Sequence, residues 1–274
     1  MVYWNEILIY AVLSISLTFF YALWSDPIIG LIIGLLLFFS ILNVRQLNFF
    51  KSLSQFRPRY IRYLLPVLLE WLIALPIQFV VLGTVNLDAI SNAGSKALLN
   101  IFFLQLFLII REEIATSFCW LMLAFLVMRL LKVKELYKSN LKFVLVVMAI
   151  FFAIGHLPNV VATAKYPSFN MPERILGATF IFLNAFIFGL FIKTIYIKTR
   201  SIQTCVAVHF FVNLRQVFFP MMGQQFDLLT FDMIGYEALI LIIYIIATCV
   251  LWREEWHLER LNEVYAALDA MPLK

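Results

Sequence analysis

The feature that most constrains this chain is a succession of apolar segments, each about as long as a membrane is thick. A helix that crosses the hydrocarbon core needs roughly 20 apolar residues, and such runs recur between Ile7 and Trp252. Of the 274 residues, 64% are hydrophobic and 14% are charged, whereas soluble domains have about 45–50% apolar and about 25% charged residues. The sequence therefore predicts an all-α fold, a polytopic membrane helix bundle of about eight transmembrane helices.

The expected spans divide the chain into one membrane domain and a short tail. They cover approximately residues 7–24, 28–44, 63–85, 97–131, 143–157, 175–197, 202–219 and 234–252. We expect residues 1–252 to form a single transmembrane domain, with a motif-bearing core at about 97–219. In the tail, residues 253–274, apolar residues from Trp256 to Leu268 recur near helical spacing between charges, which predicts an amphipathic helix on the cytoplasmic face.

The loop charges predict the orientation of this bundle. The loops after the second, fourth and sixth expected spans are basic, and the intervening loops carry few Lys or Arg residues. By the positive-inside rule this places both termini in the cytoplasm and the protein in the cell membrane as a multi-pass chain. The same rule accounts for the net charge of +5, so no nucleic-acid partner is predicted.

Charged residues interrupt the fourth apolar segment. Arg111-Glu112-Glu113 lies in the middle of residues 97–131, while His156 and His209 each lie inside another apolar segment. A carboxylate at bilayer depth costs several kcal/mol, so it usually marks function and faces a protein interior or water. We therefore expect the two carboxylates and the two imidazoles to share one site.

Two further polar positions follow from helical spacing. Phe152 and His156 are four residues apart, as are His209 and Asn213, so each pair lies on one helix face. Glu70, in the third expected span, is interpreted as an ion-pair partner or cavity residue and not as a catalytic group.

The length of the fourth segment sets a geometric condition. A straight helix of 35 residues would extend about 52 Å, against a hydrocarbon core of about 30 Å. The segment must therefore bend, tilt or start as a helix lying along the interface, and a break near Ile110–Glu113 is expected. The Glu pair can meet the histidines only if its helix tilts or projects one or two turns into the cytoplasm. We expect that it does, so that the site lies near mid-membrane and opens to the cytoplasm.

These groups allow two kinds of hydrolytic chemistry. A carboxylate can take a proton from water while an imidazole or amide orients that water and stabilises an oxyanion. Alternatively, Glu112, His156 and His209 could bind zinc, with water as the fourth ligand. The residues alone leave open whether zinc or no cofactor takes part.

The motifs resemble those of the CAAX-protease and bacteriocin-processing (CPBP, or Abi) family of intramembrane proteases. The first family motif is a Glu-Glu pair, here Glu112-Glu113. The second is Phe-x-x-x-His, here Phe152 to His156. The third is His-x-x-x-Asn, here His209 to Asn213. Ser201 and Gly189 also stand where the family pattern has serine and glycine, and the resemblance covers about residues 107–214.

The resemblance implies roles for these residues. Glu112 would activate water, and His156 and His209 would position the water or stabilise the oxyanion, with Asn213 assisting and Glu113 completing the catalytic set. Family members have been described both as metalloproteases and as metal-free glutamate-dependent enzymes, and the second description is preferred here.

One position departs from the family pattern. The first motif has an arginine four residues after the second Glu, and Ser117 stands there instead. Glu113 then needs another partner or would be protonated by desolvation. Arg111 lies about 240° round a helix from position 117, so it cannot simply replace the arginine on the same face, and Arg215 is another candidate. Without a compensating cation, activity would be reduced or lost.

The sequence thus predicts an intramembrane endopeptidase that cleaves a membrane-associated or lipidated peptide or protein substrate in the lipid bilayer. One alternative is a non-catalytic, family-like membrane scaffold for bacteriocin immunity or regulation, for which Ser117 is the evidence. A less favoured alternative is a proton-coupled transporter that uses Glu70, Glu112 and the histidines as a relay.

Overall fold

A computed structural model describes most of the motif-bearing helices. The described residues are 58–81, 105–106, 109–110, 112–113, 116–117, 120–157, 171–221, 231–256 and 258–269. Their main elements are η1 (Pro58–Leu64), α4 (Leu65–Val81), α7 (Trp120–Leu130), α8 (Lys138–Gly155), α10 (Met171–Thr199), α11 (Ile202–Met221), α12 (Phe231–Arg253) and α13 (Leu258–Asp269). Every element in these residues is helical, which confirms the all-α prediction for this part of the chain.

Two of the described helices, Lys138–Gly155 and Arg174–Thr199, are long and apolar enough to cross a membrane. Shorter apolar helices cover Ile202–Leu214 and Ala238–Arg253. The first two expected spans lie outside the described residues, so the number of eight stays a prediction.

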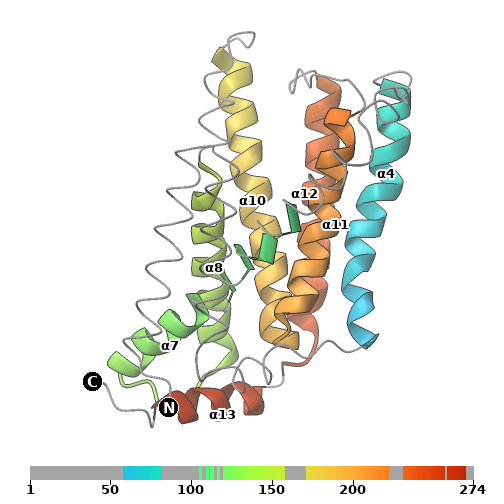
Figure 1. Ribbon diagram of the computed structural model, residues 1–274. Helices are drawn as coiled ribbons and strands as arrows, with labels where there is room; N and C mark the ends of the chain where they lie inside the picture. Colours follow the sequence, from blue (N-terminus) through green and yellow to red (C-terminus); the bar gives the residue numbers. More distant parts are fainter. Residues whose placement is uncertain are drawn as a thin grey trace.

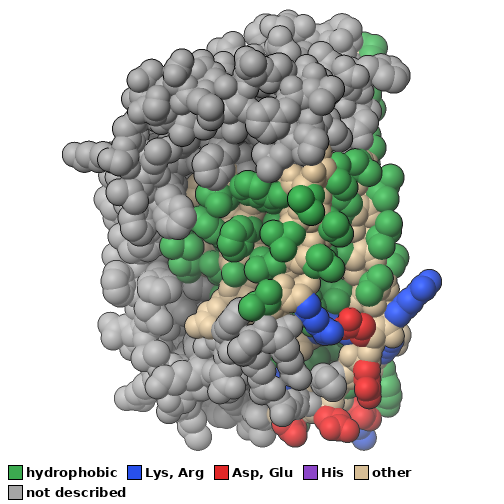
Figure 2. Space-filling model, turned by 90° about the vertical axis from the view of Figure 1, so that its right-hand side faces the viewer, with side chains coloured by type: hydrophobic (Ala, Val, Ile, Leu, Met, Phe, Trp, Pro, Cys, Tyr) green, Lys and Arg blue, Asp and Glu red, His purple; other side chains and the backbone are tan. Residues whose placement is uncertain are grey.

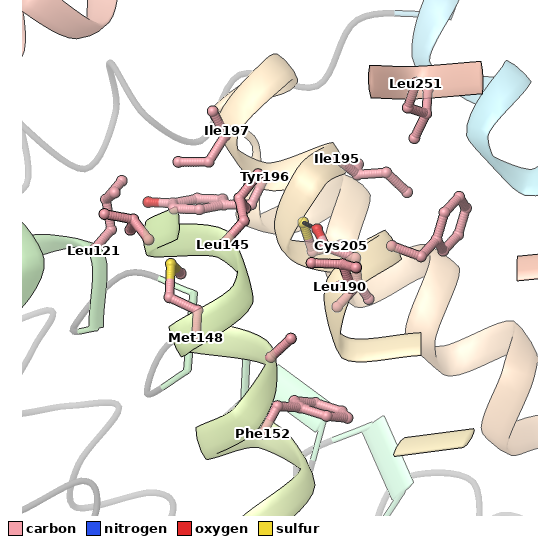
Figure 3. Packing of buried hydrophobic residues seen from close by; sticks show 14 of the residues in the cluster. Leu121, Leu145, Met148, Phe152, Leu190, Ile195, Tyr196, Ile197, Cys205 and Leu251 are labelled. Carbon is pink, nitrogen blue, oxygen red and sulfur yellow. Dashed lines mark hydrogen bonds between the residues drawn. The ribbon is translucent and has the colours of Figure 1, made fainter. Parts of the chain in front are cut away.

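Helix α10 lies at the centre of the bundle. It packs against α8, α11 and α12, and α12 also contacts α4. In Figure 1 these helices stand roughly side by side, while α13 lies across one end. Figure 3 shows Leu145 and Met148 of α8 in the same buried cluster as Ile195 and Tyr196 of α10. The α8–α10 contact therefore forms much of the core that supports the functional groups.

Charged side chains gather at the end of the bundle near α13. Glu254 pairs with Arg62 at 3.1 Å and with Lys198 at 3.4 Å, and the Tyr60 hydroxyl donates a hydrogen bond to the Thr199 carbonyl. Figure 2 shows charged groups at this end and apolar side chains above them on the described part of the face. Basic ends of several helices thus lie together, as the positive-inside argument requires. Their cytoplasmic location stays a prediction.

The outer faces of α4 and α12 are apolar and exposed. Leu65 and Leu72 of α4 are 58% and 68% exposed, and Ile246 and Val250 of α12 are 58% and 52% exposed. Exposed apolar surface of this kind marks an interaction with lipid or protein. It is the surface expected of helices that contact acyl chains.

Helix α13 occupies the position of the expected tail helix. Leu261 and Tyr265 on one face are buried. The Tyr265 hydroxyl donates to the carbonyl of Val133 at 2.7 Å, and the Asn262 side chain accepts from the backbone N–H of Leu136 at 2.8 Å. The helix is therefore docked on the link between α7 and α8.

The described pieces of the interrupted apolar segment lie obliquely to the neighbouring helices. Its described pieces at Ile109–Ile110 and Glu112–Glu113 are α-helical, and a wider π-type turn follows at Thr116–Ser117. These pieces and α7 follow an oblique line in Figure 1, in agreement with the expected tilt. The described irregularity lies at Thr116–Ser117, just after the region where a break was expected. Such turns often occur at functional sites.

Candidate active site

A tight turn between α10 and α11 places two side chains of the candidate site at the same level of the bundle. Arg200 has a positive φ of 52°, and the Ser201 side chain accepts a hydrogen bond from the Thr204 N–H at 3.1 Å. This is an N-cap interaction, which fixes the start of α11. Lys193 precedes the turn by about 9 Å of helix and His209 follows it by about 10 Å, at 1.5 Å per residue. The two side chains therefore lie at similar depth.

Glu112 lies between two imidazoles that come from different helices. Its Oε1 is 4.0 Å from Nε2 of His156, at the end of α8. Its Oε2 is 4.0 Å from Nε2 of His209, on α11. The side chains of Glu112 and His156 are 20% and 26% exposed, whereas that of His209 is 3% exposed. The group is thus open on the side of Glu112 and His156.

Glu113 faces the protein interior. Its side chain is 0% exposed, and its Oε1 is 2.8 Å from Nδ1 of His209. Its Oε2 accepts hydrogen bonds from the Ser117 hydroxyl at 2.7 Å and from Nζ of Lys193 at 3.0 Å. A buried carboxylate needs such partners, because an unpaired buried charge costs several kcal/mol. The two adjacent carboxylates therefore have different surroundings, one accessible and one enclosed.

The hydrogen bonds select one tautomer for each neutral histidine. The Nδ1 atom of His156 lies 3.0 Å from the carbonyl oxygen of Phe152, and that of His209 lies beside the carboxylate of Glu113. Both partners are acceptors when Glu113 is ionised, so each Nδ1 carries the proton and donates it. The Nε2 atoms that face Glu112 then present lone pairs, and they can donate only when the ring is protonated.

Aromatic rings pack around the two histidines. The Phe152 ring lies 4.8 Å from the His156 ring and 5.8 Å from the His209 ring, centroid to centroid. A Cβ atom at Gly189 would lie 2.9 Å from Phe152 Cδ1. Glycine at this position therefore lets α8 and α10 approach closely enough for Phe152 to lie between the polar groups.

Asn213 has no hydrogen bond to the four side chains of this group. It lies one turn beyond His209 on α11 and is half-buried, but it makes no hydrogen bond with a described residue. Glu70 belongs to another cluster, where it accepts a hydrogen bond from the Tyr244 hydroxyl of α12. The structure thus brings together Glu112, Glu113, His156 and His209, and leaves Asn213 at the edge.

As placed, the described side chains do not form a set of zinc ligands. Tetrahedral zinc needs nitrogen and oxygen ligands at about 2.0–2.2 Å from one common point. Among the described residues, no three His, Cys, Asp or Glu side chains lie close enough to hold a metal. Gaps of 4.0 Å between Glu112 and each Nε2 are of the size that a water spans with hydrogen bonds of about 2.8 Å.

Lys193, which reaches Glu113 from α10, is not among the site residues predicted from the sequence. Arg111 and the side chain of Arg215, the cations considered for this role, lie outside the described residues. A signal for Lys193 was present in the sequence, because it is an ionisable residue within the apolar run at about 175–197. Such residues usually face the bundle interior and pair with an opposite charge.

The comparison with known families agrees with the motifs. Residues 94–215 match the family model of the Type II CAAX prenyl endopeptidase Rce1-like proteins. No curated protein and no solved structure matches the chain. The resemblance to the CPBP family is therefore confirmed over these residues. This match supports a membrane-embedded CAAX-type endopeptidase in general, and hence a hydrolase.

Proposed function

We propose that this chain, whose residues 94–215 match the Rce1-like endopeptidases, is a metal-free intramembrane endopeptidase in which Glu112 activates water. The observation that carries the proposal is the position of Glu112, with one oxygen 4.0 Å from His156 Nε2 and the other 4.0 Å from His209 Nε2. A water in this space would have a base and two orienting groups within reach. General-base catalysis needs this geometry before any other condition.

In the first step the Glu112 carboxylate accepts a proton from water, and the water oxygen bonds to the carbonyl carbon of the substrate. His156 orients the water through its Nε2 lone pair, because its Nδ1–H is donated to the Phe152 carbonyl. Fixing the nucleophile in this way replaces a bimolecular encounter by a preorganised one.

The attack places negative charge on the carbonyl oxygen. A protonated His209 would donate from Nε2 to this oxyanion while Nδ1–H remains with Glu113. A donor aimed at a developing charge in a water-poor site is a large source of catalysis. In the tetrahedral intermediate Glu112 carries the proton from water, so the Glu113 carboxylate and the oxyanion balance the Lys193 ammonium and the His209 imidazolium.

Collapse of the tetrahedral intermediate breaks the carbon–nitrogen bond. The leaving nitrogen takes the proton that Glu112 removed from water, which restores the Glu112 anion and gives an amine and a carboxylic acid. The acid then loses its proton to solvent. We propose that the substrate is a membrane-associated or lipidated peptide or protein. The exposed apolar faces of α4 and α12 support this, because they suit a protein that meets its substrate in lipid.

The test is cleavage of a library of lipidated and unlipidated peptides by the purified chain in lipid nanodiscs. We expect cleavage that a zinc chelator does not change and that Glu112→Gln abolishes. Glu135→Gln is the matched control, because Glu135 is an exposed glutamate in the link between α7 and α8. If Glu112→Gln retained full cleavage, or chelation abolished it, this mechanism would be wrong.

A further inference from the structure

A buried lysine completes the surroundings of Glu113. Lys193 is 0% exposed. Its Nζ lies 3.0 Å from Glu113 Oε2, 2.6 Å from Thr116 Oγ1 and 2.9 Å from Ser117 Oγ. An ammonium has three N–H donors, so these three acceptors satisfy it completely. It also lies 4.8 Å from the centroid of the Phe152 ring, at the range of a cation–π contact.

The two hydroxyls are free to accept from the ammonium. Thr116 donates its own proton to the Glu112 carbonyl at 2.8 Å, and Ser117 donates its proton to Glu113 at 2.7 Å. Each therefore offers a lone pair to Lys193. The donors and acceptors form a closed set, in which the π-type turn at Thr116–Ser117 provides two of the three acceptors.

We propose that Lys193 and Ser117 together replace the arginine that the family motif has at position 117. The cation reaches Glu113 from the facing helix α10 instead of from one turn along its own helix. Ser117 is small enough to leave this space and polar enough to bind the ammonium. The charge requirement of Glu113 is thus met by another residue, and Lys193 is a positioning residue for the reaction. This inference rests on the proposed function.

The route by which Lys193 acts runs through Glu113 to His209. The cation holds Glu113 ionised and occupies its Oε2, so Oε1 remains for Nδ1–H of His209. His209 Nε2 then faces Glu112. Loss of the ammonium would let Glu113 take up a proton and donate it to Nδ1, which would reverse the tautomer. His209 could then no longer become an imidazolium, and its Nε2–H would be the weaker donor of a neutral ring to the oxyanion.

The experiment exchanges the position of the cation. Lys193→Ala should lower kcat about 100-fold, the cost of a small misplacement in a site, with KM for a cleaved peptide changed less than about threefold. Lys193→Arg should retain part of kcat. The double variant Ser117→Arg with Lys193→Ala should recover at least about tenfold of the lost kcat, because the arginine would occupy the volume and the charge site that Lys193 leaves.

The controls separate this inference from folding and from the proposed function. Lys198→Ala removes a lysine of the same helix that pairs with Glu254 outside the site, and kcat should be unchanged. Should Lys193→Ala fail to fold, Lys193→Met with Glu113→Gln removes both buried charges and should fold with kcat still low. Full kcat in Lys193→Ala or in the charge-free variant Lys193→Met with Glu113→Gln would overturn the role of Lys193. So would the absence of recovery in the double variant Ser117→Arg with Lys193→Ala. Absence of cleavage by the wild-type chain would instead overturn the proposed function.

Discussion

The Nδ1 atom of His209 lies 2.8 Å from Oε1 of Glu113, and this contact gives the two adjacent glutamates different tasks. Glu113 is enclosed and bound to His209, Ser117 and Lys193. Glu112 is 20% exposed, and its nearest imidazole nitrogens are 4.0 Å away. One carboxylate thus stabilises the structure and orients an imidazole, while its neighbour remains available for water.

The first prediction is that the same substitution affects the two glutamates differently. Glu112→Gln should abolish cleavage and shift the free energy of unfolding by less than about 1 kcal/mol, because its ion pairs are long and partly solvated. Glu113→Gln should lose about 3–5 kcal/mol, because it leaves the Lys193 ammonium without its buried counter-ion. Thermal or denaturant unfolding in detergent measures the stability of each variant, and peptide cleavage before unfolding measures its activity. Equal destabilisation by the two substitutions would contradict the distinction between them.

The second prediction concerns the close approach of α8 and α10. In Gly189→Ala the new Cβ would meet Phe152 at 2.9 Å, so Phe152 must move, and it contacts both histidines. We expect overpacking to cost about 1–3 kcal/mol and to lower kcat, although alanine favours a helix by about 1 kcal/mol over glycine.

Gly155→Ala is the matched control for this change. Gly155 is also a helical glycine at the α8 end of the site, but a Cβ there would have no neighbour within 4 Å. Cleavage rates and unfolding midpoints of the two variants should therefore differ. If Gly189→Ala were as active and as stable as Gly155→Ala, Phe152 would not need its present position.

The convergence of the functional groups could be predicted from the sequence because the reason for it is local. Carboxylates and imidazoles inside apolar runs must avoid acyl chains, and spacing of four residues places Phe152 and His156 on one face. The structure indeed places Glu112 and Glu113 beside His156 and His209.

The partner of Glu113 could not be predicted in the same way. Lys193 and Glu113 are 80 positions apart, so their contact depends on how α10 packs against the interrupted segment. Helical spacing relates only residues of one helix: it places Arg111 on a different face from position 117, and it cannot identify a cation on a facing helix. The packing of α10, with Gly189 one turn before Lys193, decides which cation reaches the carboxylate.

The third prediction concerns the second buried carboxylate. The Tyr244 hydroxyl donates to Glu70, and the Tyr244 ring lies 5.4 Å from the Phe188 ring, which is 5.1 Å from the ring of His209. Tyr244→Phe should preserve the ring packing and remove the donor. We expect a loss of about 1–3 kcal/mol in unfolding free energy with kcat changed less than about threefold. A large loss of kcat without a change in stability would instead assign the Glu70 cluster to the reaction.

The fourth prediction concerns the docking of α13. The Asn262 side chain accepts from the Leu136 N–H at 2.8 Å and donates to the Leu136 carbonyl at 3.4 Å, which joins α13 to the link between α7 and α8. Asn262→Ala removes both bonds, so α13 should detach more often. The loss of about 1 kcal/mol or slightly more should make limited proteolysis near residues 253–258 about tenfold faster. Glu263→Gln is the control, because Glu263 is the exposed neighbour on the same helix. Cleavage at the same rate in both variants would show that Leu261 and Tyr265 hold α13 without the amide.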